Sequence, residues 1–246
     1  MPIKLYDLVA QKPGGRFFSP FCIVARCALL AKGIDFETVE VTYSDLRFHW
    51  SPKLGVQRAT APIIELEDGT CIMDSVEIAK YFDKTYPDRT NLFLPEAPLP
   101  VDVTSKEYQD AVESYPAIQK LPEFKDIRMD VFALYAPRIT KTFDEETAEY
   151  WKSKERLAES VERLKQFLKV VSSRLFTEDR QFLASSTKPG MEDFCLLGQY
   201  RLFRSTSATI AAQIFESPEA GEFQNWLKRM KEHFPLEEQV ARDPKE

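Results

Sequence analysis

Two hydrophobic patterns follow one another along this chain, and their order limits the folds open to it. Through residue 86, short stretches of alternating apolar and polar residues exchange with stretches of helical period. The expected elements are a strand over 3–9, a helix over 21–33, a strand over 36–41, an irregular segment over 42–60, a hairpin over 61–74 and a helix over 76–86. The order βαβ followed by ββα predicts a thioredoxin-like half-domain.

Single residues give the expected ends of these elements. Gly33 follows the first apolar helix and is a typical glycine stop. Asp68-Gly69 is a dipeptide that favours the tight turn of a hairpin. Ser75 precedes the third helix and is expected to cap it.

Prolines separate this half-domain from the rest of the chain. Pro87, Pro95, Pro98 and Pro100 interrupt regular structure and predict a linker over 87–102. The later sequence has helical period, most clearly over 146–176. There, one helix face carries the apolar residues Leu157, Val161, Leu164, Leu168, Val171 and Leu175. This stripe is too short for a stable coiled coil, so we expect a core seam of a helical bundle.

The expected architecture is therefore α/β plus all-α. A thioredoxin-like domain occupies 1–86, and an all-helical domain occupies 103–246. "KPGMEDF" (188–194) reads as a capping box before a buried helix, with Gly190 as the cap and Asp193 as its third helical residue. Glycine cannot supply the usual hydroxyl, so we expect one of the two reciprocal bonds to be missing.

Composition excludes several classes of function. The 246 residues are 43% hydrophobic and 29% charged, which is ordinary for a globular protein. A net charge of -6 opposes nucleic-acid binding, and no apolar run is long enough to cross a membrane. The N-terminus has no signal-peptide centre, so we expect a cytoplasmic protein. Four scattered cysteines and two histidines show no metal-binding spacing, and we expect free thiols and no metal.

The tetrapeptide Ser19-Pro20-Phe21-Cys22 stands where a helix is expected to begin. Cys-Pro-aromatic-Cys at such a place is a dithiol redox motif, in which the first thiolate attacks and the second resolves. Here serine replaces the attacking cysteine. We expect Cys22 to be a small buried residue without a redox partner, and Cys27 and Cys195 to lie in the core as well.

The domain order and three short motifs resemble the glutathione transferases. "SPF" (19–21) opens the first helix, "APII" (61–64) enters the hairpin, and "DS" (74–75) precedes the third helix, as do that family's three glutathione-site landmarks. The stretches "IKLYDL", "RFFSP" and "DSVEIAKYFDKTYPDR" are most similar to the bacterial lignin β-etherases and the fungal-specific Fu A class. The resemblance spans nearly the whole chain, with its specific motifs in the first 90 residues.

The resemblance implies a role for each landmark. Ser19 would donate a hydrogen bond to the thiolate of glutathione at a helix N-terminus that favours negative charge; the alternative is a plain N-cap. Ala61, held by a cis bond to Pro62, would pair through its backbone with the cysteine of glutathione. Asp74 and Ser75 would hold the γ-glutamyl group, whose carboxylate suits a helix N-terminus.

Other candidates remain open at this point. Relatives often place Arg or Gln where this chain has Thr60, so the glycine carboxylate of glutathione needs a substitute partner. The candidates for that role are Arg58, Lys53, Gln57 and His49. Tyr6 competes with Ser19 as the catalytic residue, although a strand tyrosine also suits a core.

A second, hydrophobic substrate is expected between the two domains, against aromatic side chains. The candidates are Phe17, Phe18, Tyr108, Tyr115, Phe124, Phe132 and Tyr135. Aromatic rings suit planar phenolic ligands.

The sequence thus predicts a cytoplasmic, homodimeric glutathione transferase of serine type, with glutathione as co-substrate and aromatic or hydrophobic electrophiles as second substrates. Three alternatives keep the fold and change the activity: a non-catalytic ligandin for flavonoids and other polyphenols, a glutathione-dependent β-etherase, and a non-catalytic structural homologue. A thiol reductase is disfavoured, because no cysteine stands at the helix tip.

Overall fold

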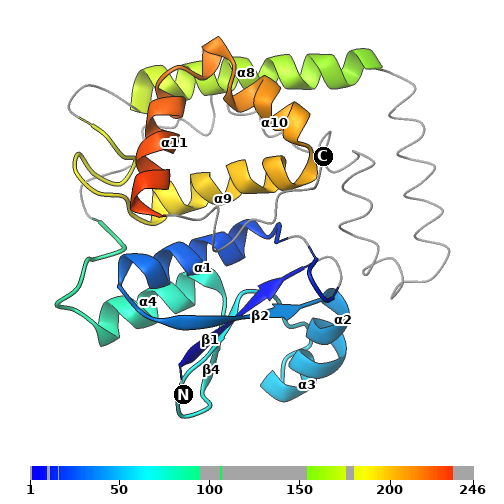
Figure 1. The fold of residues 1–246 in the computed structure, drawn as a ribbon, viewed down its shortest axis with the longest axis vertical. Helices are drawn as coiled ribbons and strands as arrows, with labels where there is room; N and C mark the ends of the chain where they lie inside the picture. The colour runs from blue at the N-terminus through cyan, green and yellow to red at the C-terminus, as the bar shows by residue number, and fades with distance from the viewer. Residues whose placement is uncertain are drawn as a thin grey trace.

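The structure is a computed structural model that describes residues 2–9, 12–15, 17–94, 106, 154–175 and 180–234 (Figure 1). The first part contains β1 (Ile3–Leu8), α1 (Pro20–Ala31), β2 (Phe36–Val41), α2 (Tyr43–Asp45), η1 (Leu46–Trp50), α3 (Ser51–Leu54), β3 (Ile63–Glu65), β4 (Cys71–Met73) and α4 (Ser75–Thr85). The second part contains α8 (Lys154–Leu175), α9 (Met191–Thr206), α10 (Ala208–Phe215), η2 (Pro218–Ala220) and α11 (Glu222–His233). The predicted linker from residue 95 onward and the candidates Tyr108, Tyr115, Phe124, Phe132 and Tyr135 lie outside the described residues.

One mixed sheet forms the base of the first part, with strand order β2-β1-β3-β4. β1 runs parallel to β2 from the Ile3–Phe36 pair to the Leu8–Val41 pair. β3 is antiparallel to both β1 and β4. This is the predicted thioredoxin-like arrangement, because the βαβ unit supplies the parallel pair and the hairpin adds the other two strands.

The expected ends of the elements are confirmed with one correction. Gly33 ends α1 in the left-handed conformation, at a φ of 60°, and Gly69 turns the hairpin at a φ of 84°. A residue with a Cβ rarely adopts these angles. The correction concerns α4, because Asp74 and not Ser75 is its N-cap, and Ser75 is the first helical residue.

The irregular segment after β2 is a chain of three short helical turns. Its first turn begins at a capping box, in which the Thr42 and Asp45 side chains bond each other's backbone N–H groups. The middle turn, η1, is a π-helix. Its last residue, Trp50, is buried and packs edge-on against Tyr6, with ring centroids 4.4 Å apart. The three turns therefore cover the face of the sheet that carries Tyr6.

Helices alone make up the described second part. The predicted seam is confirmed for Val161, Leu164 and Leu168, which are buried; the other three side chains of the stripe lie outside what the structure describes. The capping box before α9 is confirmed too, because the Gly190 N–H donates to the Asp193 carboxylate at 3.1 Å. As expected, glycine offers no side chain in return.

α1 lies between the sheet and α9, as Figure 1 shows, and joins the two parts into one core. α9 approaches the start of α1 so closely that a Cβ added at Gly198 would lie 2.6 Å from the Pro20 carbonyl oxygen. Cys22 and Cys27 are fully buried on α1, as expected. The expectation for Cys195 was wrong, because this thiol on α9 is exposed.

Within the part of the chain that the structure describes, no helix combines the length and the apolar character needed to span a membrane.

Candidate functional site

The topology gathers the three landmark motifs at one end of the sheet. Ser19 is reached from the C-terminal end of β1, and Ala61-Pro62 leads into the N-terminal end of the antiparallel β3. Asp74 and Ser75 follow the C-terminal end of β4, which runs parallel to β1 because both strands oppose β3. Ser19 stands more than forty residues before Ala61 in the sequence, and all three motifs share one edge of the fold.

Ser19 is the N-cap of α1. Its Oγ accepts a hydrogen bond from the Cys22 N–H at 3.3 Å, and Pro20, the first helical residue, has no N–H to satisfy. The capping bond uses the hydroxyl oxygen as an acceptor, so the hydroxyl hydrogen can still donate. Ser19 is 5% exposed. It therefore satisfies the helix and offers a donor at a positive helix end.

Cys22, one helical turn later, is unsuited to attack. Burial raises the pKa of its thiol well above the ordinary value, and the carboxylate of Asp7 raises it further. Asp7 lies fully buried and forms an ion pair with Arg26 at 2.9 Å. A thiol in this position stays protonated at neutral pH, which agrees with the predicted structural role.

The peptide bond between Ala61 and Pro62 is cis, as the resemblance implied. The Pro62 carbonyl accepts from the Asp74 N–H at 3.2 Å, and the Thr60 N–H contacts the Met73 sulfur at 3.2 Å. Backbone contacts thus join the second landmark to the third. Ala61 is 9% exposed.

Asp74 holds the start of α4 in a strained shape. Its φ of 85° is the only positive φ of a non-glycine residue among those described. Such a conformation costs roughly 1–3 kcal/mol and persists where surrounding contacts impose it. Here the carboxylate accepts from the N–H groups of Val76 at 2.8 Å and Glu77 at 3.2 Å. Asp74 is therefore committed to capping, and Ser75 becomes the first residue of the helix.

Lys53 and Arg58, the two basic candidates for binding the glycine carboxylate, differ in whether they already have a bonding partner. The Lys53 ammonium pairs with Glu65 at 2.7 Å and lies over the Trp50 ring at 4.4 Å. The hydrogen bond to Glu65 raises the pKa of Lys53. Glu65 ends β3, at the end away from Pro62, so Lys53 is drawn away from the gathered landmarks.

Arg58 is exposed and makes no hydrogen bond or ion pair with any residue that the structure describes. Its neighbour Ala59 is fixed, because the Ala59 N–H donates to the Ser51 hydroxyl at 2.9 Å. Arg58 therefore stands on a held backbone, three residues before Ala61, with its charge available. Of the other two candidates, Gln57 accepts from Arg47 through its backbone oxygen, and His49 lies edge-on to the Trp50 ring.

Tyr6 faces away from α1. Successive strand residues point to opposite faces, and Asp7 reaches Arg26 on α1 while Tyr6 packs against Trp50 of η1. Burial raises the pKa of the Tyr6 phenol, as does the nearby Glu65 carboxylate. This geometry matches the packing role expected for Tyr6.

The two aromatic candidates near Ser19, Phe17 and Phe18, already pack against other parts of the protein. Phe18 is buried in the core, and the half-buried Phe17 covers the Arg26 guanidinium, 5.9 Å from the ring centroid. Sequence reasoning passed over Phe21, whose ring is 58% exposed two residues after Ser19. The only signal for it was its place inside the tetrapeptide.

Comparison with known proteins matches residues 15–90 to the family model "Glutathione S-transferase, N-terminal domain". A glutathione S-transferase of Ceriporiopsis subvermispora in complex with glutathione has a TM-score of 0.58 at 20% identity, over 95% of this chain and 98% of that one. Glutathione transferase GSTFuA3 from Phanerochaete chrysosporium has a TM-score of 0.58 at 21% identity, over 95% and 97%. The β-etherase LigF from Sphingobium sp. strain SYK-6 has a TM-score of 0.54 at 16% identity, over 97% and 98%. The chain has the glutathione transferase fold.

Proposed function

We propose that this protein is a glutathione transferase of serine type, in which Ser19 stabilises the thiolate of bound glutathione. The single observation that carries the proposal is the hydroxyl of Ser19 at the N-terminus of α1, on the edge of the sheet where the cis-Pro62 and Ser75 motifs also end. A relative with this fold has been crystallised with glutathione, which supports the choice of ligand.

The tripeptide is held mainly by backbone groups and helix ends in this account. The Ala61 backbone pairs with the cysteine of glutathione. The γ-glutamyl carboxylate lies at the N-terminus of α4, where Ser75 offers its hydroxyl and its backbone N–H and the positive helix end favours an anion. The Asp74 carboxylate contributes by capping α4 and thereby setting the position of Ser75. Arg58 binds the glycine carboxylate.

The chemical step is a nucleophilic substitution. The thiolate sulfur forms a bond to an electrophilic carbon of a hydrophobic aromatic compound, and the leaving group departs with the electron pair of the broken bond. Ser19 does not attack. Its hydrogen bond keeps the sulfur ionised, and a charged hydrogen bond of this kind contributes about 1.5–3 kcal/mol.

The finer assignment is to the Fu A class and its β-etherase relatives, as a cytoplasmic homodimer that also binds phenolic ligands. The similarity in fold to GSTFuA3 and LigF supports this choice. The exposed ring of Phe21 beside Ser19 suits an aromatic second substrate.

Turnover tests the proposal against a ligandin. Calorimetry with glutathione should give saturable binding, and an activated aryl halide should be conjugated at a rate that saturates with glutathione. A phenolic β-aryl ether, tested in parallel, separates ether cleavage from simple conjugation. Tight binding of polyphenols with no conjugation of any electrophile would mean a ligandin, and absence of glutathione binding would refute the transferase.

A further inference from the structure

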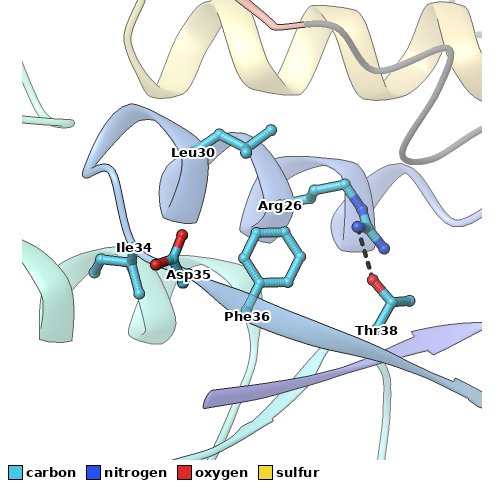
Figure 2. Close-up of a pocket in the computed structure, with 6 residues that line it drawn as sticks. All are labelled: Arg26, Leu30, Ile34, Asp35, Phe36 and Thr38. Atoms are coloured by element: carbon cyan, nitrogen blue, oxygen red, sulfur yellow. Dashed lines mark hydrogen bonds between the residues drawn. The ribbon is translucent and has the colours of Figure 1, made fainter. Parts of the chain in front are cut away.

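A pocket away from the glutathione site lies between the second half of α1 and the start of β2. Its volume is about 310 Å³, and it is lined by Arg26, Leu30, Ile34, Asp35, Phe36 and Thr38 (Figure 2). The lining strand residues stand at the N-terminal end of β2, which is parallel to β1, whereas Ser19 follows the C-terminal end of β1. The pocket is therefore at the opposite end of the sheet from the three landmarks.

Arg26 gives this pocket a fixed wall. Its guanidinium is 1% exposed and donates to the Thr38 hydroxyl and to the Asp7 carboxylate, both at 2.9 Å. The Phe17 and Phe36 rings lie 5.9 Å and 5.2 Å from it. The buried Asp7 carboxylate compensates the arginine charge, so this wall is rigid and close to neutral.

Asp35 supplies the uncompensated charge. Its side chain is exposed, and it forms no hydrogen bond or ion pair with any residue that the structure describes. Figure 2 shows its carboxylate beside the Phe36 ring, below Leu30. A negative group therefore lies at the mouth of a pocket whose other walls include Leu30, Ile34 and the Phe36 ring.

We propose that this pocket binds a small organic cation, an ammonium group carried on a compact aromatic or branched hydrocarbon body. The ammonium pairs with Asp35, and the apolar body packs against Leu30, Ile34 and Phe36. A volume of about 310 Å³ is near the lower end for small-molecule sites, which limits the body to a single ring or short chain. An anionic ligand is disfavoured, because Arg26 is already paired and Asp35 repels it.

Three probes with one body and three charges test the proposal: phenethylamine, 2-phenylethanol and phenylacetate. Backbone amide NMR of the full chain should show saturable shifts with phenethylamine, centred on residues 26–38. The alcohol should bind at least about fivefold more weakly, since one ion-pair contribution of about 1 kcal/mol corresponds to a factor of about five. Phenylacetate should give no saturable shifts there.

Two matched variants locate the charge that binds. Asp35→Asn should weaken phenethylamine binding at least about fivefold and bring it close to that of the alcohol. Glu37→Gln removes the same charge from an exposed residue of β2 that does not line the pocket, and binding should be unchanged. Equal binding of amine and alcohol, or unchanged binding in Asp35→Asn, would overturn the proposal. Neither result depends on glutathione, so the proposed transferase function would stand.

Discussion

At the scale of single residues, the basic side chains near the site differ in whether they already have a bonding partner. Lys53 is engaged by Glu65 and Trp50, whereas Arg58 makes no bond within the described chain. The sequence could propose both residues, because both precede the Ala-Pro motif by a few positions. It could not rank them, because the partner of Lys53 is twelve residues away and meets it only in the folded sheet.

This difference leads to a paired prediction. Arg58→Ala should weaken glutathione binding roughly tenfold, since a carboxylate loses a charged donor. Lys53→Ala removes the same charge from the same stretch of chain and should change the affinity less than about twofold. Calorimetry on both variants makes the comparison. A larger loss in Lys53→Ala than in Arg58→Ala would show that the glycine carboxylate lies at the other end of β3.

At the scale of elements, the sequence predicted the turns and the ends of helices, but it could not choose between two adjacent candidates for the same N-cap. Gly33 and Asp68-Gly69 act locally, and the structure uses them as expected. Asp74 and Ser75 are adjacent, and both residue types are favoured at an N-cap, so the sequence could not show which of them caps the helix. The exposure of Cys195 was missed because its immediate neighbours Phe194 and Leu196 are apolar, although Glu192 and Gln199 lie three and four residues away on the same helix face.

At this scale, the hydrogen bonds of Asp193 lead to a prediction about the stability of the fold. Its buried carboxylate accepts from the N–H groups of Leu183, Ala184 and Gly190 and from the Trp226 ring nitrogen, at 2.7–3.1 Å. In Asp193→Asn the new NH₂ group faces N–H donors. The free energy of unfolding should fall by at least about 2 kcal/mol, because buried donors lose their acceptor.

Denaturant unfolding followed by circular dichroism measures this loss. Glu222→Gln is the control, because Glu222 also lies in the first turn of a helix but is exposed, and among the described residues its carboxylate bonds only to the nearby Asn225. Its effect should stay within about 0.5 kcal/mol. Equal effects of the two substitutions would show that the hydrogen bonds to the Asp193 carboxylate do not stabilise the start of α9.

At the scale of the whole molecule, the helical part approaches the start of α1, next to Ser19, very closely. The sequence indicated the order of the two parts and the composition of each core. It could not indicate the contact between Gly198 and Pro20, because a mid-helix glycine has no local signature for a close backbone approach. A second close approach occurs at Gly190, the N-cap of α9, where an added Cβ would lie 2.6 Å from the Ala184 Cβ.

Gly198→Ala tests the close contact between α9 and Pro20, because that contact decides whether the substitution stabilises or destabilises the fold. At an ordinary interior helix position this substitution stabilises by about 0.5–1 kcal/mol. Here the new Cβ meets the Pro20 backbone at 2.6 Å, so we expect destabilisation by about 1–3 kcal/mol and a lower conjugation rate. Gln199→Ala, at the next residue of α9, should leave both quantities nearly unchanged. A more stable Gly198→Ala protein with full activity would contradict this packing.

The most direct test of the central claim is the pKa of the thiol of bound glutathione, followed by the ultraviolet absorbance of its thiolate across pH. A cysteine thiol ordinarily has a pKa of about 8.5. In the native protein the bound thiol should titrate at least about one unit lower. In Ser19→Ala this shift should shrink by roughly 1–2 units, since the lost hydrogen bond is worth about 1.5–3 kcal/mol and one pKa unit is about 1.4 kcal/mol. Ser19→Thr keeps the hydroxyl and should retain much of the shift. If bound glutathione titrates identically in the native protein and in Ser19→Ala, Ser19 does not stabilise the thiolate.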